Sequence, residues 1–168
     1  MPVTYEPIST QTLSSTSASV TLSSIPSTYT DLVIVCNIGI SVSGQTVQTI
    51  FNGNTGANYS FTELAGTGSS ASSGRLSSRS NIYSGYGIAP STDLSCTLVF
   101  NVNNYANTTT HKVLISRESS NGAGTFQGTN TIVGLWRSTA AIYEINFTPS
   151  TGNFIVGSTF TLYGIKAA

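Results

Sequence analysis

The stretch Leu94-Ser95-Cys96-Thr97-Leu98-Val99-Phe100-Asn101-Val102 alternates along its whole length. Every second residue from Leu94 to Val102 is apolar, and Ser95, Thr97 and Asn101 lie between them. Successive side chains of a β-strand point to opposite faces of a sheet, so a period of two predicts a strand with one buried face. This stretch therefore indicates β structure, and the rest of the chain can be compared with it.

The same alternation recurs through most of the sequence. It predicts core-facing sets at Leu32, Ile34, Cys36 and Ile38, and at Val47, Thr49 and Phe51. Further strands are predicted at residues 20–23, 59–64, 75–83, 112–117, 131–137, 142–147 and 158–165. These segments are rich in β-branched and aromatic residues. No window of ten or more residues has the period of a helix, and the one helical expectation is a short turn near residues 62–65.

Turn signals separate the predicted strands. Asn52-Gly53 follows an alternating run and predicts a hairpin, because a type I′ turn needs positive φ at both central residues. Pro26, Pro90 and Pro149 lie between strands, where a missing N–H costs little. Roughly ten short strands at this spacing predict an all-β fold, a single-domain antiparallel β-sandwich of jelly-roll type.

Two segments depart from the pattern. Residues 65–80 are rich in Ser and Gly and predict an exposed flexible loop. Residues 1–10 predict an extended N-terminal arm that clasps a neighbouring molecule, with residues 11–168 forming the sandwich domain. The alternative is that the first segment is a simple edge strand of the domain. In the arm hypothesis the interface residues are Pro2, Val3, Tyr5, Pro7 and Ile8.

The composition narrows the class of protein. Ser and Thr make up 52 of 168 residues, whereas charged residues make up 7%, against about 25% in ordinary soluble domains. The net charge is zero and the six basic residues are scattered, which argues against nucleic-acid binding. No apolar run approaches the roughly 18 residues needed to span a bilayer. We therefore expect neither a nucleic-acid partner nor a membrane partner.

The N-terminal sequence bears on where such a protein acts. Met1-Pro2-Val3-Thr4-Tyr5-Glu6-Pro7 has no basic region, apolar region or cleavage site of a signal peptide. Charge-poor β proteins coated with Ser and Thr are nevertheless typical of extracellular adhesins, fibres and shells. We expect a virion component, assembled in the host cytoplasm and released by lysis.

Residues able to carry chemistry are few. His111 is the only histidine, and no carboxylate lies near it in sequence. The six carboxylates form no motif, and we expect no catalytic site, no metal site, no cofactor and no enzymatic activity. The weakest alternative is an enzyme such as a polysaccharide depolymerase, and substitutions of Glu118, Glu144 or His111 without effect in a glycan assay would count further against it. Trp136 lies in an alternating strand, which favours the core over a sugar-stacking surface.

The two cysteines lie on predicted core faces. Cys36 and Cys96 are each flanked by apolar residues at alternate positions. The favoured interpretation is two buried thiols that act as small hydrophobic residues. A disulfide between neighbouring strands stays open, since sequence alone does not define the Cβ geometry.

Several phrases together resemble small virion structural proteins of tailed bacteriophages, especially phages of cyanobacteria. The resemblance is carried by residues 25–35 (Ile-Pro-Ser-Thr-Tyr-Thr-Asp-Leu-Val-Ile-Val), 51–60, 134–142 (Gly-Leu-Trp-Arg-Ser-Thr-Ala-Ala-Ile) and 161–168. It extends over most of the chain, from Tyr5 to the C-terminus. It implies a β-sandwich appendage of the capsid or tail, and it implies no particular functional residue.

Two functions follow as expectations. The first is a capsid decoration, or cement, protein that binds the major capsid protein or other virion proteins, as a homo-oligomer for which a trimer is favoured. The alternative is a tail-fibre or receptor-binding appendage that recognises glycans on the host surface. Copy number per virion distinguishes them, because tail parts occur in small multiples.

Overall fold

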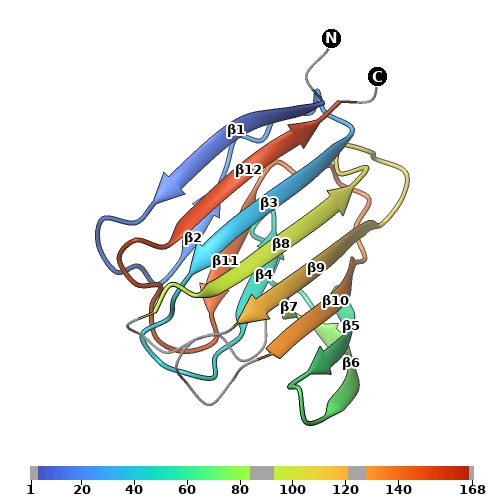
Figure 1. Ribbon diagram of the computed structural model, residues 1–168. Helices are drawn as coiled ribbons and strands as arrows, with labels where there is room; N and C mark the ends of the chain where they lie inside the picture. The colour runs from blue at the N-terminus through green and yellow to red at the C-terminus, as the bar shows by residue number, and fades with distance from the viewer. Residues whose placement is uncertain (1–3, 84–92, 121–127, 167–168) are drawn as a thin grey trace.

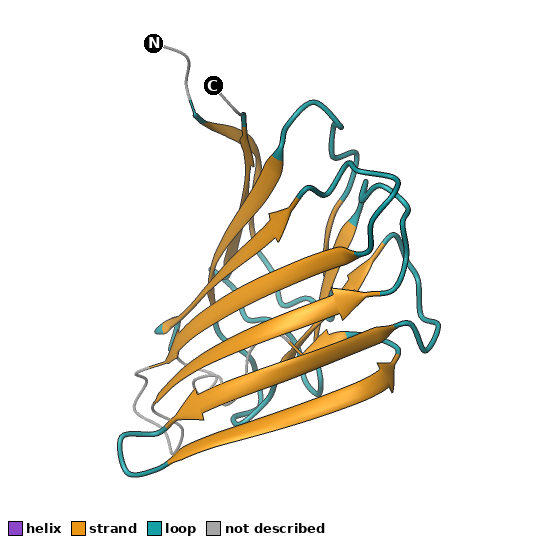
Figure 2. Ribbon diagram, turned by 90° about the vertical axis from the view of Figure 1, so that its right-hand side faces the viewer, coloured by secondary structure: helices purple, strands orange, loops and turns teal. Residues whose placement is uncertain are grey.

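A computed structural model describes residues 4–83, 93–120 and 128–166, and this part of the chain is built of β-strands without a helix (Figures 1 and 2). An eight-stranded sheet has the order β1-β12-β3-β8-β9-β10-β5-β6, and a four-stranded sheet has the order β2-β11-β4-β7. The strands are β1 (Tyr5–Thr12), β2 (Val20–Leu22), β3 (Asp31–Ile38), β4 (Val47–Phe51), β5 (Tyr59–Gly66), β6 (Ala71–Arg79), β7 (Ile82–Tyr83), β8 (Cys96–Asn103), β9 (Lys112–Ser120), β10 (Gly128–Trp136), β11 (Ile145–Pro149) and β12 (Thr159–Ile165).

Eight of these strands follow the jelly-roll order. Four antiparallel pairs, β1 with β12, β2 with β11, β3 with β8 and β4 with β7, form a ladder that folds over into two facing sheets. The pairs alternate between the sheets, so that β1-β12-β3-β8 forms one layer and β2-β11-β4-β7 the other. The predicted antiparallel β-sandwich of jelly-roll type is confirmed.

Two insertions enlarge one layer of the roll. β5 and β6 lie between β4 and β7 in the chain, and β9 and β10 lie between β8 and β11. β10 pairs with β5, so the insertions meet and extend the larger sheet by four strands, ending at β6 (Figure 1). The smaller sheet has no matching extension among the described strands, and the far end of the larger sheet therefore overhangs it.

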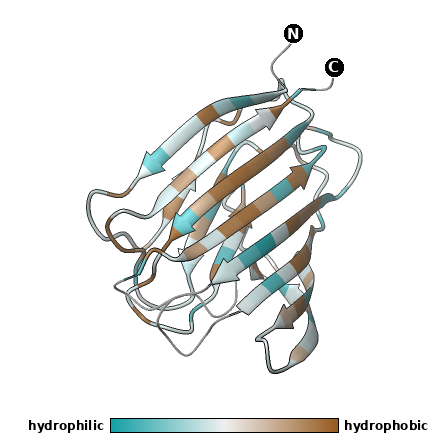
Figure 3. Cartoon of the chain, viewed as in Figure 1, coloured by the Kyte–Doolittle hydropathy of each residue, from teal (hydrophilic) through white to brown (hydrophobic). Residues whose placement is uncertain are grey.

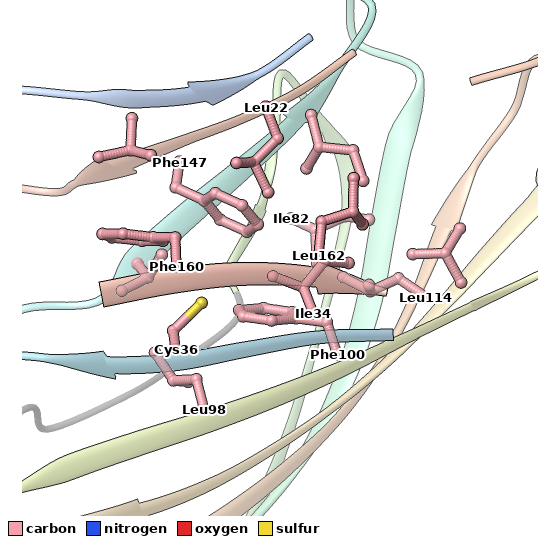
Figure 4. Close-up of a cluster of buried hydrophobic side chains, with 14 of the residues drawn as sticks. Leu22, Ile34, Cys36, Ile82, Leu98, Phe100, Leu114, Phe147, Phe160 and Leu162 are labelled. Atoms are coloured by element: carbon pink, nitrogen blue, oxygen red, sulfur yellow. The ribbon is translucent and has the colours of Figure 1, made fainter. Parts of the chain in front are cut away.

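The core fills the space between the layers. Phe147 of the small sheet packs between Phe100 and Phe160 of the large sheet, with ring centroids 5.1 and 5.7 Å apart (Figure 4). Trp136 is 2% exposed and contacts the rings of Phe51 and Tyr59. The predicted core position of Trp136 is confirmed. The central strand β3 is hydrophobic along most of its length (Figure 3).

The predicted loop at residues 65–80 is wrong except at residues 67–70, and the overlapping strand predicted at residues 75–83 includes the second half of β6. Residues up to Gly66 continue β5, and Ala71–Arg79 form β6, which pairs with β5 from Gly66↔Ala71 to Tyr59↔Arg79. β6 is largely exposed because no described strand covers either of its faces or its outer edge. A strand in this position needs few apolar residues, so its Ser-rich sequence lacks the alternation that marks the others. The short helical turn expected near residues 62–65 is likewise a strand.

The Asn52-Gly53 turn has the predicted backbone and an unpredicted role. Both residues have positive φ, 51° and 63°, and the Asn54 N–H donates to the Phe51 carbonyl at 2.9 Å. The turn does not make a hairpin, however, because β4 belongs to the small sheet and β5 to the large one. Local turn chemistry set the φ values correctly, but long-range pairing decided where the chain went next.

The first strand belongs to the sandwich. β1 pairs with β12 from Tyr5↔Ile165 to Thr12↔Thr159, so the expected boundary between residues 10 and 11 falls inside one strand. Residues 5–12 form an edge strand of the large sheet, which is the alternative to the arm hypothesis. Ile8 packs against the core, and the Glu6 carboxylate accepts hydrogen bonds from Lys166 Nζ at 2.9 Å and from the Tyr29 hydroxyl at 3.1 Å. The hydrogen bond from Lys166 holds the pKa of Glu6 below its usual value.

Candidate functional site

The residues named for possible chemistry lie on separate parts of the molecule. His111 is exposed at the start of β9, and Glu118 is 4% exposed near its end. Seven residue steps along the strand separate them by roughly 23 Å. Glu144 precedes β11, and its N–H donates to the Asn52 side-chain oxygen. The fold therefore does not bring His111 and Glu118 together.

The cysteines are both buried, as predicted. Cys36 and Cys96 lie on neighbouring strands, but Cys36 pairs with Leu98 and Cys96 with Ile38, so the two are not opposite one another. They are separate thiols, each 0% exposed. Burial raises the pKa of the Cys36 thiol well above its ordinary value.

This burial predicts inert thiols. In the native protein we expect neither cysteine to react with an aromatic disulfide reagent, because the reactive thiolate is disfavoured and access is blocked. In guanidinium chloride both should react without prior reduction. A Ser72→Cys variant, which places a thiol on the exposed strand β6, should react at once in the native state. Rapid native reaction at Cys36 or Cys96, or a missing thiol in denaturant, would contradict this prediction.

A polar row on the inner face of β9 and β10 was not anticipated. Asn130 is 3% exposed and pairs in register with Glu118, whose Oε1 accepts from the Cys96 thiol at 3.6 Å. Among the described residues, neither side-chain atom of the Asn130 amide has a hydrogen-bond partner. The alternation of β9 places Ser116 and Ser120 on the same face. Sequence could have suggested this, because the inward positions of β9 are mostly polar.

Lys112 is anchored at the other end of the same face. Its side chain is buried, and Nζ donates to the carbonyls of Thr110 at 2.7 Å and Thr139 at 3.2 Å. Burial lowers the pKa of Lys112. These contacts join the start of β9 to the loop after β10. The ammonium group of Lys112 therefore stabilises the fold at this point.

The outer face of the eight-stranded sheet is a broad surface that spans eight strands. Paired residues in antiparallel strands share a face, so Val33, Ile115, Val133 and Thr62 lie in one row across the outer side. Val133 is 49% exposed. Further exposed apolar side chains on this face are Tyr5, Leu64 and Val113. Among its described strand positions the register places only Asp31, Arg75 and Arg117 as charged residues.

A groove opens beneath the overhanging end of the large sheet. It has a volume of about 290 Å³ and is lined by Thr46, Phe61, Glu63, Gly74, Arg75, Leu76 and Tyr83. The rings of Phe61 and Tyr83 lie 5.1 Å apart, and Leu76 is 41% exposed. Arg79 donates to the Tyr83 hydroxyl at 2.9 Å and lies over its ring. We call this the β5–β6 groove.

The predicted interface residues are divided by the structure. Tyr5 is exposed on β1, where its ring contacts Tyr163, and Pro7 is exposed beside the bulge of that strand. Ile8 is half-buried. Pro2 and Val3 lie outside the described residues, so an arm at the extreme N-terminus stays a prediction.

Two further features of the described residues concern metal binding and membrane insertion. No cluster of three or more His, Cys, Asp or Glu side chains suited to a metal ion occurs among them. Nor does this part of the chain contain a helix long and apolar enough to cross a membrane.

Comparisons with known proteins supply no family. No family model and no curated protein matches the chain. A solved structure titled as a protein of unknown function from Shewanella oneidensis MR-1 aligns with 98% of this chain and 77% of its own, at 11% identity and a TM-score of 0.24. At that score the similarity carries no argument about fold or function.

Proposed function

We propose that this chain is a structural protein of a tailed-phage virion, a decoration protein that binds the head shell through the major capsid protein or another virion protein. The observation that carries the proposal is the outer face of the eight-stranded sheet. That face is broad and has few charged side chains. Its exposed apolar side chains include Tyr5, Leu64, Val113 and Val133. Exposed apolar surface rimmed by polar residues is typical of protein interaction sites.

The composition supports the same role. Charged residues make up 7% of the chain and the net charge is zero, so little electrostatic repulsion opposes close packing in a repetitive assembly. Attachment as a homo-oligomer, a trimer at local threefold positions, belongs to this proposal because shells repeat their contacts by symmetry. The resemblance of residues 25–35 and 134–142 to phage virion proteins points the same way.

Copy number and location in purified virions test the proposal. A decoration protein should be present in on the order of hundreds of copies per particle, spread over the head, because a shell repeats each contact many times. Quantitative mass spectrometry gives the number and electron microscopy gives the place. A handful of copies confined to the tail would contradict decoration and favour the alternative, a glycan-recognising tail appendage.

A matched pair of variants tests the surface. Val133→Asp places a charge in the middle of the outer face, and Val156→Asp places one in the loop before β12. The two side chains are 49% and 53% exposed, so both variants should fold. We expect Val133→Asp to weaken rebinding to stripped heads about tenfold or more, because an unpaired charge would be buried at the contact. Equal binding of the two variants would exclude the outer face as the attachment surface.

A further inference from the structure

Among the described strands, β6 presents the longest regular sheet edge, over Ala71–Leu76, because its own bulge lies between Leu76 and Arg79. The opposite edge of the large sheet, β1, contains Pro7, which lacks an N–H, and a bulge between Pro7 and Ser9. The edges of the small sheet are short, since β2 has three residues and β7 has two. β6 has nine residues, contains no proline and pairs regularly with β5 from Ala71 to Leu76. Bulges, prolines and short length are the usual means of blocking strand addition.

The β5–β6 groove lies along the inner side of this edge. Gly74 and Leu76 pair with Glu63 and Phe61, so their inner-face positions open toward the groove. Gly74 presents no side chain there, and a Cβ at that position would come within 3.0 Å of the Glu63 carboxylate. The Glu63 side chain therefore covers Gly74 on this face, and a strand added beside β6 would place one inward side chain beside Leu76 and another beside Gly74 and the aliphatic part of Glu63.

Arg75 supplies charge on the other side of the same strand. It pairs with Thr62, which is exposed on the outer face, and Arg75 is itself exposed. Within the described part of the chain it forms no ion pair, in contrast to Lys166, which binds Glu6. The other arginine of β6, Arg79, donates a hydrogen bond to the Tyr83 hydroxyl. A partner strand that pairs with β6 would thus meet an unneutralised guanidinium on one face and, on the other, a groove whose lining includes Phe61, Leu76 and Tyr83 together with Glu63.

We propose that β6 binds an extended segment of another protein by strand addition, and that this segment carries an acidic residue between two apolar residues. In the added strand the acidic side chain faces Arg75, and its two neighbours point to the groove beside Gly74 and Leu76. The pattern is symmetric, so it fits a parallel or an antiparallel segment. Main-chain hydrogen bonds supply affinity in this mode of recognition, and the alternate side chains supply specificity.

This inference rests on the proposed virion role only for the origin of the partner. The strand-addition site itself is tested with the isolated protein and synthetic peptides, whereas the virion role is tested by copy number and location. A negative peptide result therefore leaves the decoration proposal intact, and a negative virion result leaves the peptide site intact.

The test uses three capped heptapeptides. The first has the sequence Thr-Ser-Leu-Asp-Val-Ser-Thr, the second has lysine at its centre, and the third has serine in place of leucine and valine. Each is titrated into the full chain and followed by two-dimensional NMR. Amide hydrogen exchange then shows whether the β6 amides that point away from β5 become protected.

We expect the aspartate peptide to bind and to protect β6, and the lysine and serine peptides to bind roughly tenfold more weakly, because each loses one of the two recognition elements. The variant Arg75→Glu should reverse the order of affinity, so that the lysine peptide binds more tightly than the aspartate peptide. Arg117→Glu is the matched control on the same outer face, about 14 Å away across three strand spacings, and should leave the order unchanged. Leu76→Ser should weaken binding of the aspartate peptide without changing the preference for aspartate over lysine.

Three outcomes would overturn the proposal. One is the absence of binding by the aspartate peptide at millimolar concentration. Another is binding without protection of β6, or without the reversal by Arg75→Glu. The third is self-association of the chain through β6, detected as a dimer that Arg75→Glu alters, which would assign this edge to a second copy instead.

Discussion

Replacing Trp136 with alanine is expected to lower the free energy of unfolding by about 3–5 kcal/mol, the cost typical of deleting a large buried aromatic side chain. Trp136 is 2% exposed, stacks on Tyr59 with an interplanar angle of 13°, and contacts Phe51 with centroids 5.7 Å apart. It pairs in register with Lys112 and Tyr59. The side chain therefore fastens the inserted strands to the jelly roll, and its loss leaves a cavity at that junction.

Trp136→Phe is the matched control. It keeps an aromatic ring at the site and removes the indole N–H, which has no hydrogen-bond partner in the described part of the chain. We expect a loss below about 1.5 kcal/mol, because the group removed is itself buried and unsatisfied. Urea unfolding followed by circular dichroism measures both variants, since Trp136 is the only tryptophan and its fluorescence disappears with it. Similar small losses in the two variants would show that the cavity collapses and that the junction is held elsewhere.

Gly164→Ala should cost about 1–3 kcal/mol through overpacking. A Cβ at Gly164 would lie 2.3–2.5 Å from three ring carbons of Tyr29. The ring would have to leave β12, which also breaks the hydrogen bond from its hydroxyl to Glu6. The thermal midpoint and the urea midpoint should both fall.

Two comparisons isolate the clash. Gly66→Ala, where the nearest atom to a new Cβ is Thr129 Cγ2 at 3.9 Å, should be neutral or slightly stabilising. In a Tyr29→Ala background, adding Gly164→Ala should cost almost nothing, because the two changes remove the same contact. An unchanged penalty in that background would mean that the ring of Tyr29 is not the cause.

Alternation in the sequence predicts a strand where one face of that strand is buried. It gives no prediction where neither face is buried. The inward sets Leu32 to Ile38 and Val47 to Phe51 follow from alternation, because core contact selects every second residue. Only the second half of β6 was predicted, as part of the strand at residues 75–83, since no described strand covers its faces and its Ser-rich sequence lacks the alternation of a half-buried strand. The β5–β6 groove was hidden for the same reason. It depends on the pairing of Gly74 with Glu63, and register between distant or irregular segments has no local signal.

The jelly-roll ladder has a consequence for how the protein is made. β1 precedes the other described strands in the chain, yet its only described partner is β12, which begins at Thr159. At elongation rates of about 5–20 residues per second, roughly 8–30 s pass between the synthesis of the two strands. Throughout this interval β1 has no partner in the large sheet. Abundant Ser and Thr between the apolar positions break up long adhesive segments, which helps the incomplete chain remain dispersed until β12 closes the sheet.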